Sequence, residues 1–332
     1  MGCKITRIDY YLPEKVLTNE ELEKLSSRLS AEKLEKRVGI RERLIAGKDE
    51  TALDLAYNAA LKVLAGYDKN TIDLVILCTQ CPDYFLPASA CILQDRLGLR
   101  TATGAFDFNL GCSGYIYGLA MAKSFINSGL VNTVLFVVSD TMTKFIHEKD
   151  FGSRIIFGDG AAASIIEKND EESIFEFILG TDGKGWEHLI VPYGGLRHRY
   201  DPDANAVEDE SGNIRTPNNL YMNGTEIFNF TIERVPQLVA DVLKKNRLEM
   251  ADIDYFIFHQ ANKYMIEYLR KKIKIPQEKF FENMLYTGNT SSATIPIALK
   301  EVLDQGLIKK DDRVLLCGFG VGYSWGATIL KI

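Results

Sequence analysis

The chain contains an internal duplication. The string IDLVILCTQ, which begins at Ile72, resembles IDYFIFHQA at Ile253, and NTVLFVVSD at Asn132 resembles DRVLLCGFG at Asp312. The offsets of these two matches are 181 and 180 residues. A third match, of FGDGAAASII with GVGYSWGATIL, follows in the same order at a smaller offset. Three matches in one order and at similar spacing indicate a repeated structural unit.

Each copy alternates strand-like and helix-like segments. Residues 74–77 and 134–138 are short apolar runs, which are typical of strands buried on both faces of a parallel sheet. Residues 113–127 between them carry apolar side chains at helical spacing. No proline-rich or low-complexity linker divides the chain. We therefore predict an α/β fold of two duplicated units, residues 1–172 and 173–332.

Two further segments of the second copy have distinctive patterns. Residues 227–245 have a helical period, but Pro236 lies inside it, which predicts a kink or an earlier start of the helix. Residues 196–219 are polar and rich in Gly, Pro, Asp and Asn, so we expect a long surface excursion there.

The composition argues against several classes of function. The chain has 39 Lys and Arg against 45 Asp and Glu, a net charge of -6, which gives no overall field that attracts nucleic acid or an anionic membrane. No long apolar run or signal-peptide pattern is found, so we expect no membrane span and no secretion. Cysteines in apolar strings predict reduced thiols and a cytoplasmic protein. Cys78 and Cys81 form a lone Cys-x-x-Cys pair, and we expect no metal site.

Cys112 is the first candidate for chemistry. In FDFNLGCSGYIYGLA a strand is followed by a turn, and Cys112 stands at the start of the predicted helix. Free N–H groups and the helix dipole favour a thiolate there, but the dipole alone shifts a thiol pKa by only about one unit. A nucleophile therefore needs a further partner, usually a histidine. The alternative is a small buried thiol that packs a helix start.

His259 and Asn289 are the candidates for that partnership. His259 ends the apolar strand YFIF, where ligands bind in open α/β sheets, and it occupies the place that Cys78 holds in the first copy. Asn289 lies on a glycine-flanked turn before a helix, close to the place of Cys112 in the duplicated register. The alternatives are that His259 is a hydrogen-bonded core residue and that Asn289 is a helix cap.

Other motifs are excluded by their context. The string GFGVGYSWG from Gly318 begins like a dinucleotide-binding loop, but residues 323–332 after it have a strand pattern rather than a helix pattern. The string GCSG at Gly111 lacks the glycine spacing of a hydrolase nucleophile elbow. The set of Cys112, His259 and Asn289 remains.

Together, the motifs resemble the β-ketoacyl-acyl carrier protein synthase III family of the thiolase superfamily. The resemblance covers essentially the whole chain in the family's order, through the strings RVGIRER, NLGCSGYIYGLA, FGDGAAA, FHQAN, GNTSSATIP and GFGVGYSWG. It implies a thiolase-like fold, with the two units in five layers, α-β-α-β-α, and a homodimer. It also implies decarboxylative condensation of an acyl primer with a malonyl group on acyl carrier protein. Coenzyme A or carrier thioesters would be the substrates, and no cofactor would be needed.

The resemblance also implies a role for each candidate. Cys112 matches the nucleophile that takes the acyl group, and His259 and Asn289 match the pair that hydrogen-bonds the malonyl thioester oxygen. The backbone N–H groups of Cys112 and Val321 would hold the acyl-enzyme carbonyl. Many family members have glycine where Val321 stands, so a positive φ there would strain this chain.

Substrate-binding residues depart from the family pattern. Lys33 and Phe151 stand where well-known members have a tryptophan and an arginine that sandwich the adenine of coenzyme A, whereas Arg37 is kept. We therefore expect an unusual primer or a carrier-bound donor, in a specialised pathway. Leu86 replaces a common phenylalanine at the acyl pocket of the partner subunit and predicts a roomier pocket. The resemblance adds two further substrate-binding residues, Thr225 and Phe319.

A basic segment follows His259. Lys263, Lys271 and Lys272 are candidates for docking the acidic carrier protein, although Tyr264 stands where well-known members have an arginine. A solvated helix face is the alternative. For the whole protein, the alternatives are acyl transfer to an alcohol or amine without decarboxylation, a non-catalytic partner subunit, and a thiol hydrolase.

Overall fold

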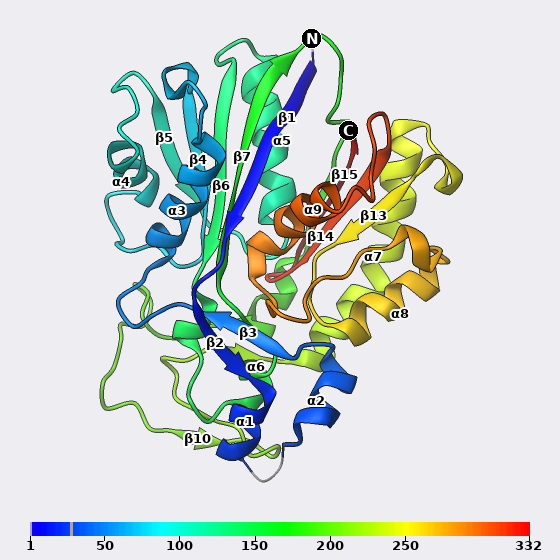
Figure 1. The fold of residues 1–332 in the computed structure, drawn as a ribbon. Helices are drawn as coiled ribbons and strands as arrows, with labels where there is room; N and C mark the ends of the chain where they lie inside the picture. Colours follow the sequence, from blue (N-terminus) through cyan, green and yellow to red (C-terminus); the bar gives the residue numbers. More distant parts are fainter. Residues whose placement is uncertain (1, 27–28) are drawn as a thin grey trace.

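The computed structural model of the chain describes residues 2–26 and 29–332 (Figure 1). Its strands are β1 (Gly2–Tyr11), β2 (Lys15–Thr18), β3 (Glu42–Ile45), β4 (Leu74–Cys78), β5 (Gly104–Phe108), β6 (Thr133–Asp140), β7 (Gly160–Asn169), β8 (Ile178–Thr181), β9 (Leu189–Ile190), β10 (Val207–Glu208), β11 (Ile214–Arg215), β12 (Tyr221–Met222), β13 (Tyr255–Phe258), β14 (Arg313–Gly320) and β15 (Ser324–Lys331). Its α-helices are α1 (Asn19–Leu25), α2 (Ala31–Val38), α3 (Ala52–Leu64), α4 (Ser89–Arg96), α5 (Gly114–Asn127), α6 (Phe151–Arg154), α7 (Gly224–Asn246), α8 (Lys263–Ile273) and α9 (Thr294–Asp304).

Two sheets repeat one strand pattern. The first has the order β1-β7-β6-β4-β5, in which β4 is parallel to β5 and β6, and β7 is antiparallel to both β6 and β1. The second has the order β13-β14-β15-β8, with β13 parallel to β14 and the remaining pairs antiparallel. Strands β4, β6 and β7 therefore correspond to β13, β14 and β15. A parallel bridge from Phe256 to Phe280 stands where β5 stands in the first sheet.

The lengths of two connections explain why the third sequence match has a smaller offset. Residues 141–159 join β6 to β7, whereas only residues 321–323 join β14 to β15. The long connection in the first copy carries α6, and the short one is a tight turn. Both sheets are thus built from one plan with an insertion in the first. The dividing point between residues 172 and 173 stays a prediction.

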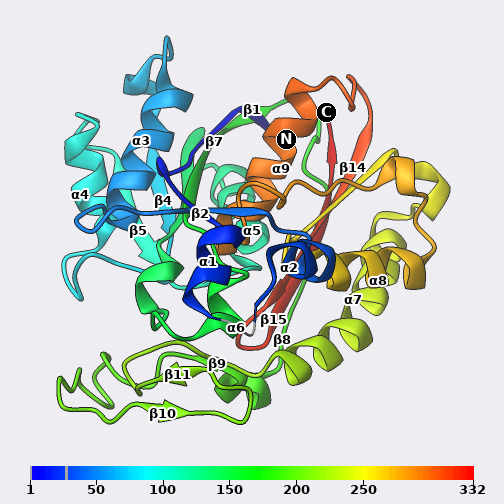
Figure 2. The same ribbon diagram turned by 60° about the horizontal axis from the view of Figure 1, so that its bottom comes forward.

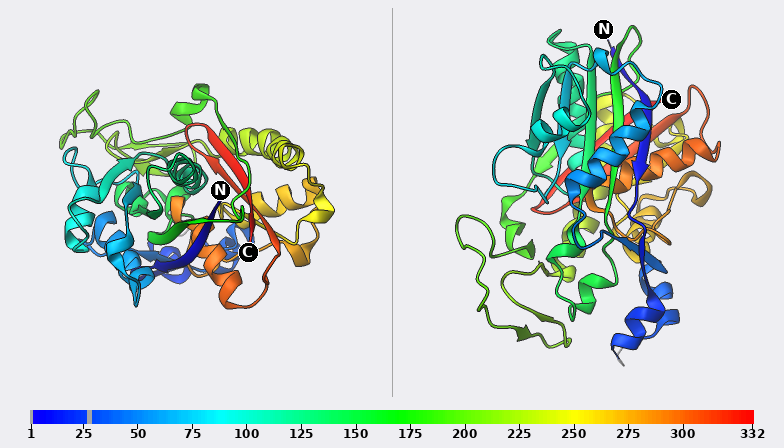
Figure 3. Two further views of the ribbon diagram at one scale, coloured as in Figure 1. Left: turned by 90° about the horizontal axis from the view of Figure 1, so that it is seen from above. Right: turned by 60° about the vertical axis from the view of Figure 1, so that its left-hand side comes forward.

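The core forms three apolar layers around the two sheets. Leu135 and Val137 of β6 point to α3 and α4, whereas Val134, Phe136 and Val138 point to the opposite face. That opposite face packs on α5 and α9, which lie between the sheets and also contact β13, β14 and β15. The other face of the second sheet packs on α7 and α8. Seen from above, the layers follow in order α-β-α-β-α, as predicted (Figure 3).

Helix α7 contains Pro236 and starts at Gly224, three residues before the predicted start. Proline has no N–H, so the carbonyl of Ile232 loses its usual partner one turn later. Lys272 of α8 supplies the missing donor, because its Nζ lies 2.8 Å from the Ile232 oxygen. A side chain from the neighbouring helix thus compensates for the proline.

Replacing Lys272 with methionine should lower the free energy of unfolding by about 1 kcal/mol, because the Ile232 carbonyl loses its donor. In a Pro236→Ala background, the new N–H at position 236 takes this role, so the same Lys272 substitution should have a much smaller effect. Urea unfolding followed by circular dichroism measures both. Equal effects in the two backgrounds would show that Lys272 does not act through this carbonyl.

The polar segment 196–219 forms the predicted excursion at the edge of the molecule (Figure 2). It contains the two-residue strands β10 and β11. Arg215 fixes it to the body, since its guanidinium lies 3.3 Å from buried Asp150, the N-cap of α6, as well as against Asp209. The excursion is therefore held beside α6 by an ion pair.

Candidate active site

Cys112 lies in a tight turn between β5 and α5. The N–H of Gly114 donates to the Gly111 carbonyl at 2.7 Å, and Cys112 itself is 7% exposed. The end of β14 packs directly on it, because a Cβ at Gly320 would lie only 2.8 Å from the Cys112 sulfur. Only glycine at position 320 leaves room for the thiol, so the second half of the chain closes over Cys112 in the first.

Burial dominates the electrostatics of Cys112. It raises the pKa of the thiol to about 12, and the nearby Asp140 carboxylate adds to the increase. The Cys112 backbone N–H and the Ser291 hydroxyl oppose this shift. The helix start favours the thiolate as expected, but desolvation of the charge outweighs this contribution. Cys112 rests as a thiol.

His259 follows β13 at the end of the second sheet. Its backbone N–H donates to the Cys317 carbonyl at 2.8 Å, and its ring nitrogen Nδ1 lies 2.7 Å from the Thr294 hydroxyl. The Phe319 ring meets the imidazole edge-on, with 5.7 Å between the ring centroids. Burial lowers the pKa of His259 to about 3, so the ring is neutral at pH 7. These contacts fix both the position and the plane of the ring.

Asn289 lies in the turn before α9. Its N–H donates to the Ile156 carbonyl at 2.9 Å, and its own carbonyl accepts from the Gly158 N–H at 3.0 Å. Its side-chain Oδ1 accepts from the Ser291 N–H at 2.9 Å. This bond orients the amide, so Nδ2 is the group that remains to donate to a ligand. The first half of the chain thus holds Asn289 through its backbone.

One residue, Ser291, links the three candidates. Its hydroxyl lowers the pKa of the Cys112 thiol, its N–H donates to Asn289 Oδ1, and its carbonyl accepts from the Thr294 hydroxyl that contacts His259. Ser291 is buried and has a positive φ of 55°. The structure therefore brings the three predicted residues together around a single turn. The sequence analysis selected Asn289 of this turn but did not assign a role to Ser291.

Asp140 is a further site residue that the sequence analysis missed. It ends β6, is fully buried, and accepts hydrogen bonds from the Gln80 N–H and from the Ser292 hydroxyl at 2.8 and 2.6 Å. In the duplicated register Asp140 corresponds to Gly320, and Ser292 corresponds to Cys112. Each sheet thus ends against the helix start of the other half. Asp140 lies at the carboxyl end of a strand, where ligands bind in open α/β sheets, so the argument that pointed to His259 also points to Asp140.

Replacing Asp140 with asparagine should speed alkylation of Cys112 by iodoacetamide at neutral pH. The Asp140 charge raises the pKa of the thiol, so its removal lowers that pKa and increases the thiolate fraction. Asp159→Asn is the matched control, because Asp159 is also buried but does not act on Cys112. Equal alkylation rates in the wild type and Asp140→Asn would contradict the assignment.

The predicted oxyanion loop is anchored beside Cys112. The Val321 carbonyl accepts from the Ser324 hydroxyl at 2.9 Å, and that hydroxyl shares a hydrogen bond of 2.7 Å with Ser113. The backbone of Val321 does not have a positive φ. The strain considered from the sequence therefore does not arise.

The predicted substrate-binding residues occupy different environments. Arg37 on α2 and Thr225 in the first turn of α7 are exposed, and Phe151 is half-buried at the start of α6. Leu86 is 82% exposed on the loop between β4 and α4. Phe319 is 1% exposed and lies against His259, so it supports the imidazole instead of offering an open surface to substrate.

The three predicted docking lysines lie on α8 and already have partners. Lys263 is 3.3 Å from Glu282, and Lys271 is 3.2 Å from Glu267. Lys272 binds the Ile232 carbonyl, as described above. Their side chains remain exposed, but part of the positive charge is balanced locally.

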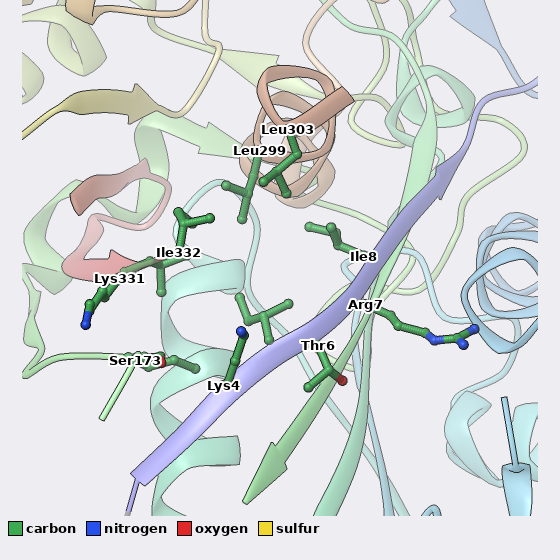
Figure 4. Close-up of a pocket in the computed structure, with 12 residues that line it drawn as sticks. Lys4, Thr6, Arg7, Ile8, Ser173, Leu299, Leu303, Lys331 and Ile332 are labelled. Carbon is green, nitrogen blue, oxygen red and sulfur yellow. The ribbon is translucent and has the colours of Figure 1, made fainter. Parts of the chain in front are cut away.

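Other features of the described chain do not add to this site. The apolar hollow in Figure 4 is lined by residues of β1, α9 and the C-terminus. Leu330, one of them, pairs with Val314 at the start of β14, whereas Cys112 meets Gly320 at its end. Among the described residues, no group of three or more His, Cys, Asp or Glu is placed to hold a metal ion. No described helix is long and apolar enough to cross a membrane.

Comparison with known proteins agrees with this geometry. Residues 106–183 match the family model for 3-oxoacyl-[acyl-carrier-protein] synthase III, and residues 243–332 match the model for its C-terminal part. The β-ketoacyl-[acyl-carrier-protein] synthase III of Clostridioides difficile is 38% identical over 98% of this chain and 97% of its own length. The chain belongs to the 3-oxoacyl-[acyl-carrier-protein] synthase III family. It is therefore a condensing acyltransferase of the synthase III type.

Solved structures of the family have the same fold. A crystal structure of a 3-oxoacyl-(acyl-carrier-protein) synthase III superposes with a TM-score of 0.98 at 45% identity, and each chain covers all of the other. The Thermus thermophilus synthase III gives a TM-score of 0.88 at 35% identity, covering 100% of this chain and 99% of that one. These matches confirm the thiolase-like fold predicted for this synthase III.

Proposed function

We propose that this synthase III condenses an acyl primer with a malonyl group on acyl carrier protein, through an acyl-Cys112 intermediate. The observation that carries the proposal is the burial of Cys112, His259 and Asn289 around the single turn at Ser291. A nucleophile and two polar groups that are buried from water suit acyl transfer followed by stabilisation of an enolate oxygen.

The first step transfers the acyl group. The Cys112 sulfur attacks the thioester carbonyl of the donor, the new thioester forms, and the donor leaves as a free thiol that carries the proton of Cys112. The N–H groups of Cys112 and Val321 would stabilise the oxyanion of the intermediate. The anchoring of the Val321 loop through Ser324 and Ser113 supports this role.

The second step makes the carbon–carbon bond. The malonyl thioester loses carbon dioxide, and the electron pair of the broken bond forms an enolate. His259 and Asn289 would donate hydrogen bonds to the enolate oxygen. The enolate carbon then attacks the acyl-Cys112 carbonyl, and the thiolate of Cys112 leaves. The fixed amide of Asn289 supports this role, because it can donate without titrating.

Intact-mass spectrometry tests the proposal. The protein is incubated with a panel of acyl-CoA and acyl-carrier donors, and acylation of Cys112 is detected. Malonyl carrier protein is then added, and the product should contain two further carbons, with carbon dioxide released. A product that contains an ester or amide instead would favour acyl transfer without decarboxylation. No adduct from any donor would overturn the catalytic assignment.

The donor is proposed to carry an unusual primer or to be bound to a carrier protein. Exposed Lys33 and half-buried Phe151 offer neither the indole nor the guanidinium that would sandwich adenine, although exposed Arg37 would be available to a phosphate. Transfer rates from acetyl-CoA and from a panel of acyl carrier proteins would be compared. A clear preference for acetyl-CoA would overturn this part of the proposal.

The carrier protein is proposed to dock on α8 through Lys263, Lys271 and Lys272. Their exposed side chains support contact with an acidic partner. Electrostatic steering weakens with salt, so the KM for malonyl carrier protein should rise with ionic strength. An unchanged KM would argue against this surface.

The protein is further proposed to act as a cytoplasmic homodimer. Strand β5 is the edge of the first sheet, and the loop beside it exposes Tyr84, Phe85 and Leu86 at 60%, 78% and 82%. Such an apolar group beside a free sheet edge is typical of an interface between proteins. Sedimentation of the wild type and of Phe85→Asp would show a dimer and a weakened dimer, respectively.

The proposed location in the cytoplasm is supported by the cysteines. All six cysteines of the protein are free thiols, which fits a reducing compartment.

A further inference from the structure

The hydroxyl of Thr294 stands between a catalytic ring nitrogen and a backbone carbonyl. Its Oγ1 lies 2.7 Å from His259 Nδ1 and 3.1 Å from the Ser291 oxygen. All three residues are at most 3% exposed, so water does not replace either contact. The three groups must therefore share the available protons among themselves.

Counting these protons decides the arrangement. A carbonyl oxygen only accepts, a hydroxyl has one hydrogen to donate, and a neutral imidazole carries one ring proton. If the Thr294 hydrogen points to the Ser291 carbonyl, Oγ1 accepts from Nδ1–H of His259. Both contacts are then hydrogen bonds. If it points to Nδ1 instead, the two oxygens face each other at 3.1 Å with no hydrogen between them.

The surroundings hold this arrangement in place. The Ser291 N–H is bound to Asn289 Oδ1, which fixes the turn and therefore the position of its carbonyl. Phe319 packs edge-on to the imidazole and limits rotation of the ring. The pKa of His259 is lowered to about 3 by burial, so the ring has a single proton at pH 7. The question is then which of the two ring nitrogens carries this proton.

We propose that Thr294 is a positioning residue that places the ring proton of resting His259 on Nδ1, so that Nε2 presents a lone pair to the active site. This inference rests on the proposed function. In the first step, Nε2 would take the proton from the Cys112 sulfur and pass it to the sulfur of the leaving thiol. The carbon–sulfur bond to Cys112 forms as that of the donor breaks, and the ring returns to its starting form.

The same contact affects the second step differently. A donor to the enolate oxygen needs a proton on Nε2. Turning the Thr294 hydroxyl from the Ser291 carbonyl to Nδ1 favours that form, because Nδ1 then accepts. The two half-reactions therefore need the Thr294 hydroxyl to point in opposite directions. Removal of this hydroxyl should slow one half-reaction more than the other.

The tautomer can be observed directly in the full-length protein labelled with ¹⁵N-histidine. The nitrogen signals of His259, assigned by their loss in His259→Gln, should show Nδ1–H in the wild type. Thr294→Ser keeps the hydroxyl and should keep this tautomer. Thr294→Val removes it, leaving Nδ1–H without an acceptor, so the proton should move to Nε2. Nε2–H in the wild type, or no change in Thr294→Val, would overturn the proposal.

Rates of the two half-reactions complete the test. Acylation of Cys112 should slow by about tenfold or more in Thr294→Val and recover in Thr294→Ser, because a correctly protonated base is lost and restored. Malonyl decarboxylation should slow much less. Thr231→Val is the matched control, since Thr231 is also buried but its hydroxyl has no partner in the described chain. Equal slowing of both steps would overturn the proposal.

Failure of the proposed function would look different. If wild-type Cys112 accepts no acyl group from any donor, the proposed function fails, but the nitrogen signals still report the tautomer. If the wild type condenses normally and the tautomer of Thr294→Val is unchanged, the proposed function stands and only the role of Thr294 fails.

Discussion

Replacing Cys112 with alanine should abolish condensation, with a loss on the order of 10⁵-fold or more in kcat. The acyl-enzyme cannot form without the sulfur, and no other thiol takes its place. Cys91 is exposed on α4, and the other four thiols are buried, with pKa values raised by burial: Cys3, Cys78, Cys81 and Cys317. The protein should remain folded, because alanine fits the space under Gly320.

Radiolabelled acyl donor and intact-mass spectrometry measure this loss. The wild type should gain one acyl group and Cys112→Ala none. Cys91→Ala, which removes an exposed thiol, should behave as the wild type. Acyl transfer to Cys112→Ala at the wild-type rate would place the nucleophile elsewhere and would contradict the whole site.

Replacing Asn289 with aspartate should reduce condensation by a factor of roughly 100 or more, because one donor to the enolate oxygen is lost. The variant isolates this donor. Aspartate has nearly the shape of asparagine and can still accept from the Ser291 N–H through one oxygen. Its second oxygen only accepts, and its charge opposes the charge that develops on the enolate.

The two half-reactions of Asn289→Asp provide their own control. Acylation of Cys112, followed by mass, should change little, whereas release of labelled carbon dioxide from the malonyl substrate should fall with condensation. His259→Ala should show a loss of similar size in decarboxylation. A variant that acylates slowly but decarboxylates normally would assign Asn289 to the wrong step.

The features that follow from local sequence pattern were predictable. The apolar runs predicted strands β4 and β6, and the internal repeat predicted their counterparts in the second sheet. His259 was predicted from its position at the carboxyl end of a strand. Cys112 and Asn289 were found because each lies in a turn before a helix, and the duplicated register placed those turns opposite one another.

The remaining features depend on tertiary contacts, some within the second half of the chain and some between the halves. Asp140 binds Ser292 across 152 positions, and Thr294 contacts His259 across 35, and no spacing rule predicts these bonds. The resting thiol of Cys112 could not be anticipated either, because its desolvation comes from the strand end at Gly320. The support that Lys272 gives to Ile232 likewise appears only when two helices pack.

The crossed contacts at the two strand ends also bear on how the chain evolved. An ancestor with one unit, pairing with an identical copy, would have carried two equivalent half-sites. In the present chain Gly320 leaves space for Cys112, while at the counterpart position Asp140 binds Ser292. The two strand ends are therefore equivalent in position but differ in chemistry: one leaves space for the proposed nucleophile, and the other forms a buried polar contact between the halves.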